Sequence, residues 1–400
     1  MKVLVVHNRY RSEQPSGENN VVDAEVELLS AGGVQVGRFE RRSDDIAAMS
    51  LPRKAFVPLQ VPWNRWARAD LAARLRAERP DVVHVHNTFP LLSPSVLAAC
   101  ADARVPVVAT LHNYGLVCPP GTLYRDGRIC TDCVGGPPLP AVRHGCYRES
   151  AVATLPMAAN LLVNRARWRS GVTRFFCISA AQRRVLVDAG MPAARMTVKH
   201  NFVTDPGVRR TGAGEHVLFL GRLTPEKGVP LLMAAWDLLG GELGLPLVIA
   251  GTGPLSDEVS AWASSRPDVS YVGLRDKDSC RALTASAAAV VAPSAWLEAF
   301  GLVVVEAMAA GVPTVAPAHG AFPELISDGV TGVLHAPGSA PALAGALRDV
   351  VSDPDRNRKM GEAARHRYDD DFTPEVGFRR LIEGYEAAIA SHGSALPGSV

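Results

Sequence analysis

Short runs of β-branched residues alternate with helical patterns from one end of the chain to the other, and this alternation is the strongest constraint on the fold. A strand, a helix and a second strand form a βαβ unit, in which the two strands run parallel. At 400 residues, the chain is longer than a single hydrophobic core normally serves. The sequence therefore predicts an α/β protein of two domains, each built on a parallel sheet.

The first alternating series fills the front half of the chain. Its expected strands are 2–8, 34–40, 81–87, 106–112, 174–179 and 196–201, and its expected helices are 18–31, 66–78 and 179–189. The pattern stops near Thr204–Gly207, and the polar, glycine-containing stretch Arg209–Gly214 that follows favours a linker. We therefore expect an N-terminal Rossmann-like domain over 1–205.

A second series follows the linker. Its expected strands are 216–220, 247–250, 269–272, 289–292 and 313–316. Each runs into Gly or Pro within a few residues, as βα turns at a ligand-binding edge often do. This predicts a C-terminal Rossmann-like domain over 206–373. The remaining segment, 374–400, begins with an amphipathic helix over Pro374–Ala390 and has no strand after it.

Composition and charge narrow the class of protein. With 47% apolar and 20% charged residues, the chain is typical of a soluble globular protein. No run approaches the roughly 18 apolar residues of a membrane span, and the first residues form a strand instead of a cleavable signal, so we expect a cytoplasmic location.

Residues 1–180 carry 22 Lys and Arg against 15 Asp and Glu, whereas residues 181–400 carry 20 against 25. The basic front half favours an anionic partner, such as a phosphate-bearing acceptor or an acidic membrane, although a random surface imbalance explains it as well.

The most informative motif runs from Glu298 to Glu306, with the sequence Glu-Ala-Phe-Gly-Leu-Val-Val-Val-Glu. Its two carboxylates straddle an expected strand-to-helix turn, where Gly301 lets the backbone approach a ligand closely. The N–H groups that open the helix, from Gly301 to Val303, suit a diphosphate. Glu298 is then placed to reach a sugar, and Glu306 to accept hydrogen bonds from ribose. The alternative is an amphipathic helix with an exposed glutamate at each end.

A second motif, Gly221-Arg-Leu-Thr-Pro-Glu-Lys-Gly228, falls where the first βα loop of the second domain is expected. A diphosphate leaving group gains negative charge, which Arg222 as a bidentate donor and Lys227 as a point charge can neutralise without Mg²⁺. Alone, such residues are usually solvated; together with the glutamate pair they favour a functional role. Gly251-Thr-Gly-Pro254 lacks the third glycine of a dinucleotide fingerprint and predicts a tight loop lining a cleft.

These segments resemble family-4 glycosyltransferases, which transfer sugars from UDP- or GDP-sugars with retention of configuration. The resemblance spans nearly the whole chain and is strongest over 216–337. It implies a GT-B fold, in which two Rossmann-like domains face a central cleft and the C-terminal helix packs back across them.

The resemblance also assigns roles in the donor site. It implies that Arg222 and Lys227 bind the donor phosphates, that Glu298 lies by the donor sugar, and that Glu306 binds ribose. The expected donor-binding residues are Gly17, Arg222, Lys227, Gly251, Val272, Gly273, Leu274, Glu298, Phe300, Gly301, Leu302 and Glu306, with Val272 to Leu274 at the nucleobase. The expected catalytic residues are His112, Glu298, Arg222 and Lys227.

In the front domain, two stretches resemble the family. Gly17-Glu18-Asn19 resembles its glycine loop, although Ser16 stands where the family usually has a second glycine, which predicts a stiffer loop. His112 ends an expected strand and matches the histidine that faces the donor sugar.

Three more polar residues end an expected strand of the front domain at the same sheet edge. They are His84, His86 and Asn87. The two histidines alternate on one strand face, and both an acceptor-side role and a purely structural role explain them.

The segment 114–150 interrupts the alternation, because it is rich in Gly, Pro and Cys and too long for an ordinary connection. It contains Cys118, Cys130, Cys133 and Cys146. Four thiolates in a reducing compartment suit a closed tetrahedral zinc site, with free thiols or a redox pair as the alternatives. Such a zinc would be structural.

One stretch has the character of a membrane-surface helix. Ala151–Ser170 is apolar and then carries Arg165, Arg167 and Arg169 around Trp168, a pattern that also fits a core helix with a solvated end.

We therefore expect a metal-independent, retaining glycosyltransferase of EC class 2.4, for instance in polysaccharide biosynthesis. It would move a sugar from a UDP- or GDP-sugar to a hydroxyl of a glycan, a lipid-linked acceptor or a small molecule, and no nucleic-acid partner is expected. The leaving phosphate would act as the base, so no Asp or Glu base is needed. The alternatives are a nucleotide-sugar 2-epimerase and an inactive sugar-nucleotide-binding protein.

Overall fold

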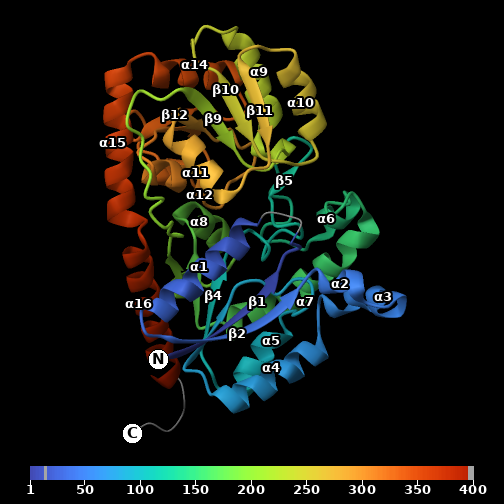
Figure 1. The fold of residues 1–400 in the computed structure, drawn as a ribbon. Helices are drawn as coiled ribbons and strands as arrows, with labels where there is room; N and C mark the ends of the chain where they lie inside the picture. Colours follow the sequence, from blue (N-terminus) through green and yellow to red (C-terminus); the bar gives the residue numbers. More distant parts are fainter. Residues whose placement is uncertain (13–15, 395–400) are drawn as a thin grey trace. The chain divides into compact units, whose positions relative to one another are not determined.

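The computed structural model describes residues 1–12 and 16–394, which form two compact units (Figure 1). Of the described residues, unit 1 comprises Met1–Leu123, Thr131–His200 and 377–394, and unit 2 comprises Tyr124–Cys130 and Asn201–Val376.

Unit 1 is built on a six-stranded parallel sheet. In spatial order its strands are β2 (Gln35–Arg42), β1 (Lys2–Arg9), β3 (Val82–Val85), β4 (Val107–Leu111), β7 (Arg174–Cys177) and β8 (Met196–Val198). All six strands expected in the front half are therefore confirmed. The chain leaves β1 for β2 on one side and returns to β3 on the other, and this reversal is the topological switch point at which such sheets bind ligands.

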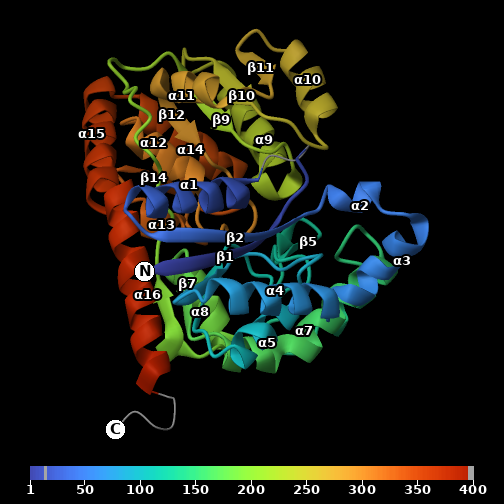
Figure 2. The ribbon, with the colours of Figure 1, turned by 60° about the horizontal axis from the view of Figure 1, so that its bottom comes forward.

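Helices cover both faces of this sheet. On one face, α1 (Gly17–Ala31) and α16 (Pro374–Ser394) bury Val22, Leu29 and Leu381 against strand residues such as Val5 and Phe176. The other face is covered by α4 (Arg65–Glu78), α5 (Ser95–Asp102) and α7 (Ala151–Gly171) (Figure 2). The remaining helices of unit 1 are α2 (Asp45–Ala48), α3 (Leu51–Gln60), α6 (Leu139–Arg143) and α8 (Ala180–Asp188).

Unit 2 contains a second six-stranded parallel sheet. Its order is β11 (Val269–Gly273), β10 (Leu247–Ala250), β9 (His216–Leu220), β12 (Ala287–Val291), β13 (Thr314–Pro317) and β14 (Gly332–His335). This is the doubly wound order of a Rossmann fold, with its switch point between β9 and β12. Five of these strands were expected from the sequence, and β14 was not.

The core of unit 2 also has two sides. One surrounds Trp236 and is formed by α9 (Val229–Leu239), α10 (Ser256–Ser264) and α14 (Ala340–Val351). On the other, α11 (Lys277–Ala285) and α12 (Leu302–Ala309) pack against β9 and β12. The helices α13 (Phe322–Leu325) and α15 (Pro354–Asp371) complete the unit. Two Rossmann-like units confirm the expected fold class.

The cysteine-containing segment has little regular structure. Its antiparallel hairpin, β5 (Tyr124–Arg125) and β6 (Arg128–Ile129), groups with unit 2, whereas its flanking parts belong to unit 1. Two-residue strands leave no periodic signal, so the sequence does not predict them.

Among the helices of the described residues, none is both long enough and apolar enough to cross a membrane.

Candidate active site

In unit 2, the predicted donor-site residues gather at the carboxyl ends of β9 and β12. The loop after β9 carries Arg222 and Lys227, and the loop after β12 carries Glu298. The two loops are joined where the N–H of Ala295 donates to the carbonyl of Glu226, at 2.9 Å. Residues far apart in the chain therefore meet at the switch point, as the order of the strands requires.

Lys227 and Glu298 form the centre of this site. Nζ of Lys227 donates to Oε2 of Glu298 at 2.8 Å, and the same oxygen accepts from Ser294 Oγ at 3.1 Å and Trp296 Nε1 at 2.9 Å. Burial by itself would raise the pKa of Glu298, but the charge of Lys227 and these hydrogen bonds lower it below its usual value. Glu298 is therefore a fixed carboxylate beside a fixed ammonium.

The helix α12 begins beside this pair. Its N-cap, Gly301, has φ of +105°, and a Cβ at this position would lie 3.0 Å from the ring of Phe322. Because glycine has no side chain to cap them, the first N–H groups of α12 are available to a ligand. This arrangement is suited to an anion.

The other predicted donor residues lie around the same edge. Arg222 is exposed, with its guanidinium 3.6 Å from the carboxylate of Glu226. Gly251 has φ of +144°, and a Cβ there would overlap the carbonyl oxygen of Gly221, so the two loops touch through backbone. Glu306 is exposed on α12. Val272 and Gly273 end β11, and Leu274 is exposed immediately after it.

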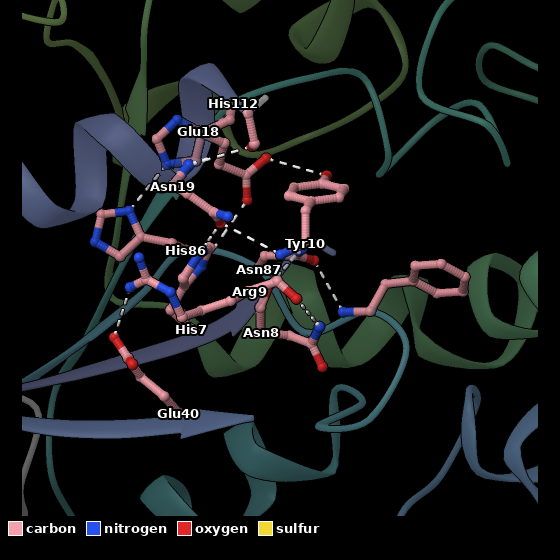
Figure 3. A network of polar contacts seen from close by, with 12 residues as sticks. His7, Asn8, Arg9, Tyr10, Glu18, Asn19, Glu40, His86, Asn87 and His112 are labelled. Carbon is pink, nitrogen blue, oxygen red and sulfur yellow. Dashed lines mark hydrogen bonds and ion pairs between the residues drawn. The ribbon is translucent and has the colours of Figure 1, made fainter. Parts of the chain in front are cut away.

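In unit 1, His86 and His112 form part of a polar network at the ends of β1, β3 and β4 (Figure 3). Nδ1 of His86 lies 2.9 Å from Nε2 of His112, so one of these nitrogens donates to the other. Burial lowers the pKa of His84, His86 and His112 well below 6.5, which makes all three neutral at pH 7.

His84 has a structural environment. Its Nδ1 lies 2.7 Å from the hydroxyl of Tyr385 on α16, and its Nε2 lies 2.7 Å from the hydroxyl of Thr110. Both ring nitrogens are thus occupied within the core, which favours the structural alternative for this residue. Asn87 also makes a structural contact, since its side-chain amide donates to the backbone carbonyl of Asn8 at 2.9 Å.

A buried ion pair lies beneath these histidines. Nζ of Lys199 donates to Oε1 of Glu25, and both side chains are almost fully buried. The other oxygen of Glu25 is 3.7 Å from Nε2 of His86 and 3.9 Å from Nδ1 of His84. Within the described chain, Glu25, His84 and His86 are the one group of three His, Cys, Asp or Glu side chains whose ligand atoms all lie within 4.8 Å of one another, close enough to hold a metal ion. Both ring nitrogens of His84 are already hydrogen-bonded, and the buried ammonium of Lys199 bonds Oε1 of Glu25. A metal ion here would lie beside that buried positive charge, so the group does not suit a cation.

The start of α1 contributes a carboxyl group to the network. The N-cap of α1 is Ser16, whose hydroxyl accepts from the N–H of Asn19, so Gly17 is the first helical residue. Ser16 thus provides the cap where the family usually has a second glycine. The next residue, Glu18, accepts from the hydroxyl of Tyr10 at 3.2 Å, and burial raises its pKa to about 8.

The four cysteines of the predicted zinc site differ in burial. Cys118 and Cys133 are buried and interact closely enough for Cys133 to contribute to the raised pKa of Cys118, about 11, which burial chiefly causes. Cys130 and Cys146 are half-buried. Among the described residues, no three cysteine sulfurs lie within 4.8 Å of one another. The zinc site stays a prediction.

Sequence reasoning missed the residues that support the predicted ones. They are Tyr10, Glu25, Lys199, Ser294 and Trp296. Ser294 and Trp296 stand four and two residues before Glu298, which is the one signal that could have found them.

Two family models match the chain. Residues 15–205 match the model described as Glycosyltransferase Family 4, and residues 209–367 match that described as Glycosyl transferases group 1. The sequence is 33% identical over 323 residues to the glycogen synthase of Mycobacterium tuberculosis (strain CDC 1551 / Oshkosh), which covers 78% of this chain and 70% of the relative. It is 37% identical over 410 residues to the phosphatidyl-myo-inositol mannosyltransferase of Mycobacterium leprae, covering 96% of each chain.

Solved structures show the same fold. The sucrose-phosphate synthase of Thermosynechococcus elongatus superposes with a TM-score of 0.70 at 19% identity, covering 98% of this chain and 99% of that one. Anabaena HepE in complex with UDP-glucose superposes with a TM-score of 0.64 at 19% identity, covering 99% and 100%.

Proposed function

The chain belongs to glycosyltransferase family 4, and on this premise we propose that it transfers a sugar from a UDP- or GDP-sugar to an acceptor hydroxyl, with retention and without a catalytic metal. The acceptor is a glycan, a lipid-linked sugar or a small molecule. The observation that carries this proposal is the Lys227–Glu298 pair beside the open N-terminus of α12. A UDP-sugar donor is further supported by the UDP-glucose complex of HepE.

The proposed chemistry depends on the leaving group. As the bond between the sugar and the diphosphate breaks, negative charge grows on the phosphate oxygens. Lys227, Arg222 and the N–H groups of α12 supply positive charge in fixed positions, which is the electrostatic role that Mg²⁺ plays elsewhere. Lys227 is held in place by Glu298, so little reorganisation is needed when the charge develops.

Retention follows if the acceptor attacks the same face of the sugar that the diphosphate leaves. The departing phosphate then takes the acceptor proton, and no protein carboxylate is required as base. In this scheme Glu298 and His112 orient the sugar, and Glu306 binds ribose; these roles stay predictions.

The experiment is a transfer assay in EDTA with NMR analysis of the product. We expect full activity in EDTA and an anomeric configuration identical to that of the donor. An absolute requirement for Mg²⁺ or Mn²⁺, or an inverted product, would contradict the proposal.

Two alternatives give different results in the same assay. A nucleotide-sugar 2-epimerase would convert UDP-GlcNAc to its epimer without acceptor, and an inactive binding protein would bind nucleotide and turn over nothing. The paired cation and carboxylate at the donor edge favour transfer over both.

We also propose that unit 1 rests on an anionic membrane surface through α3 and α7. Residues 46–69 and 150–187 contain no Asp or Glu. The two stretches meet where the amide of Asn164 donates to the carbonyl of Pro62, at 2.8 Å. Exposed apolar side chains lie along both: Leu51, Phe56, Leu59, Trp63, Trp66, Val152, Leu155, Leu162 and Val163.

Arginines accompany these apolar side chains. The guanidiniums of Arg167 and Arg65 lie 4.5 Å from the ring centres of Trp63 and Trp66 respectively. Apolar and aromatic residues among cations, without acids, are the composition that binds the interface of anionic lipids.

Sedimentation with phosphatidylcholine vesicles, with and without phosphatidylglycerol, tests this proposal. We expect binding only with phosphatidylglycerol, and its loss in Phe56→Ser/Leu59→Ser. The matched control is Leu238→Ser, an exposed leucine of α9. Equal binding of the double variant would contradict the proposal.

A further inference from the structure

Unit 1 contains a cavity of about 140 Å³ at the carboxyl edge of its sheet. All its lining residues belong to unit 1. His112, His86 and Asn87, three residues of the predicted site, lie on its wall with Glu18 and Tyr10, whose arrangement Figure 3 shows. The cavity is therefore part of the predicted acceptor side.

The lining of this cavity combines two kinds of side chain. The polar kind includes Tyr10, Glu18, Asn87, His112 and Asn160. The apolar kind includes Met157, Leu161 and Trp168 of α7, together with Pro119 and Pro120. A site that combines apolar side chains with a few polar groups suits a ring that has hydroxyls at its edge and C–H groups on its face.

The charge of the cavity excludes another class of ligand. Among the described residues that line it, none is a lysine or an arginine, and Glu18 is the one carboxylic acid. Burial keeps the lining histidines His86 and His112 neutral. A phosphate or carboxylate entering here would be desolvated without a cation to pair with, and would face a carboxyl group.

Glu18 is placed to read a hydroxyl. Its Oε2 accepts from Tyr10, and its Oε1 is 4.0 Å from Nδ1 of His7, beyond hydrogen-bonding distance. Within the described chain, Oε1 therefore has no hydrogen-bond partner. It can serve as donor or acceptor to a ligand hydroxyl, depending on protonation.

We infer that this cavity takes the acceptor as an uncharged, hydroxyl-bearing sugar ring, and that Glu18 is the residue that selects it against phosphorylated rings. The inference rests on the proposed function and deepens it by naming the substrate class. The basic residues of the front half lie outside the cavity, since none of its described lining residues is a lysine or an arginine.

The test compares methyl glycosides of glucose, mannose, galactose and N-acetylglucosamine with the 6-phosphates of the same glycosides, by calorimetric binding and as acceptors. We expect at least one neutral glycoside to bind about tenfold more tightly than its 6-phosphate. At pH 9, above the pKa of about 8 of Glu18, the variant Glu18→Gln keeps the size of the side chain and removes its charge, and this ratio should fall below about threefold. The matched control, Glu27→Gln, changes an exposed glutamate of the same helix and should keep the wild-type ratio.

Donor binding provides the separating measurement. Binding of UDP and GDP to the wild-type protein, and hydrolysis of their sugars without acceptor, report on the proposed function alone. If nucleotide does not bind at all, the proposed function fails. If nucleotide binds but 6-phosphates bind as well as neutral rings, or no neutral ring binds, or the ratio is unchanged in Glu18→Gln, the inference fails and the proposed function stands. Should Glu18→Gln not fold, the wild-type ratio alone decides the substrate class.

Discussion

Nζ of Lys227 lies 2.8 Å from Oε2 of Glu298, across 71 positions of the chain. Three donors converge on this one oxygen, so the carboxylate fixes the ammonium beside the N-terminus of α12. In the absence of donor, Glu298 thus serves as counter-ion for the cation that we assign to the diphosphate.

The first prediction concerns that cation. Lys227→Ala should lower kcat by about 10²- to 10³-fold, since removing one preorganised group that stabilises developing charge has effects of this size. Steady-state kinetics measure it, with Lys359→Ala, an exposed lysine of α15, as control. A Lys227→Ala enzyme with unchanged kcat would show that the lysine only pairs with Glu298.

Substitutions of the two glutamates of the donor motif should change different kinetic parameters. Glu306→Ala should chiefly raise KM for the donor, because a ribose contact is the same in the ground and transition states. Glu298→Ala should chiefly lower kcat, because it leaves Lys227 unheld. Equal increases of KM with kcat unchanged in both variants would refute these roles.

The buried pair in unit 1 makes a prediction about stability. Glu25→Gln should cost about 3–5 kcal/mol in the free energy of unfolding, because it leaves the ammonium of Lys199 buried without a counter-charge. The double variant Glu25→Leu/Lys199→Met should recover most of this loss. Urea titrations of the wild type, the single variant and the double variant measure these free energies of unfolding. A double variant as unstable as Glu25→Gln would mean that the ion pair itself stabilises the fold.

The pKa of Glu18 predicts how stability depends on pH. Burial raises this pKa from 4.5 to about 8, so between these values the folded protein binds more protons than the unfolded chain. The contribution of Glu18 to stability is therefore full below about pH 4.5 and falls as pH rises towards about 8. The difference in unfolding free energy between the wild type and Glu18→Gln should therefore fall as the pH rises from about 4.5 to about 8. A difference independent of pH would show that Glu18 is ionised throughout.

The cysteine segment yields a compositional prediction. Protein purified without added metal should contain one zinc per chain, and Cys130→Ser/Cys133→Ser should remove it. Elemental analysis of the zinc content of both proteins tests this prediction. Metal-free wild-type protein with four titrating thiols and full activity would leave the free-thiol alternative.

The sequence predicted the strands well because buried parallel strands are continuous apolar runs with glycine or proline after them, a local signal. It also predicted that Lys227 and Glu298 belong to one donor site, but it did not predict the ion pair between them. It could not predict Glu25 with Lys199, whose side chains meet across 174 positions without any local pattern. The carboxyl of Glu18 was visible in the motif, but its burial against Tyr10 depends on tertiary packing.

The path of α16 has a consequence for dissecting the molecule. From Gly377 this helix belongs to unit 1, where Leu381, Tyr385 and Ala388 complete the core and Tyr385 holds His84. A fragment that ends at residue 200 would expose this apolar face and leave His84 without its phenol. The first unit is therefore not encoded by an uninterrupted stretch of gene, and a soluble version of it would require a circular permutant or a fusion that supplies 377–394 in cis.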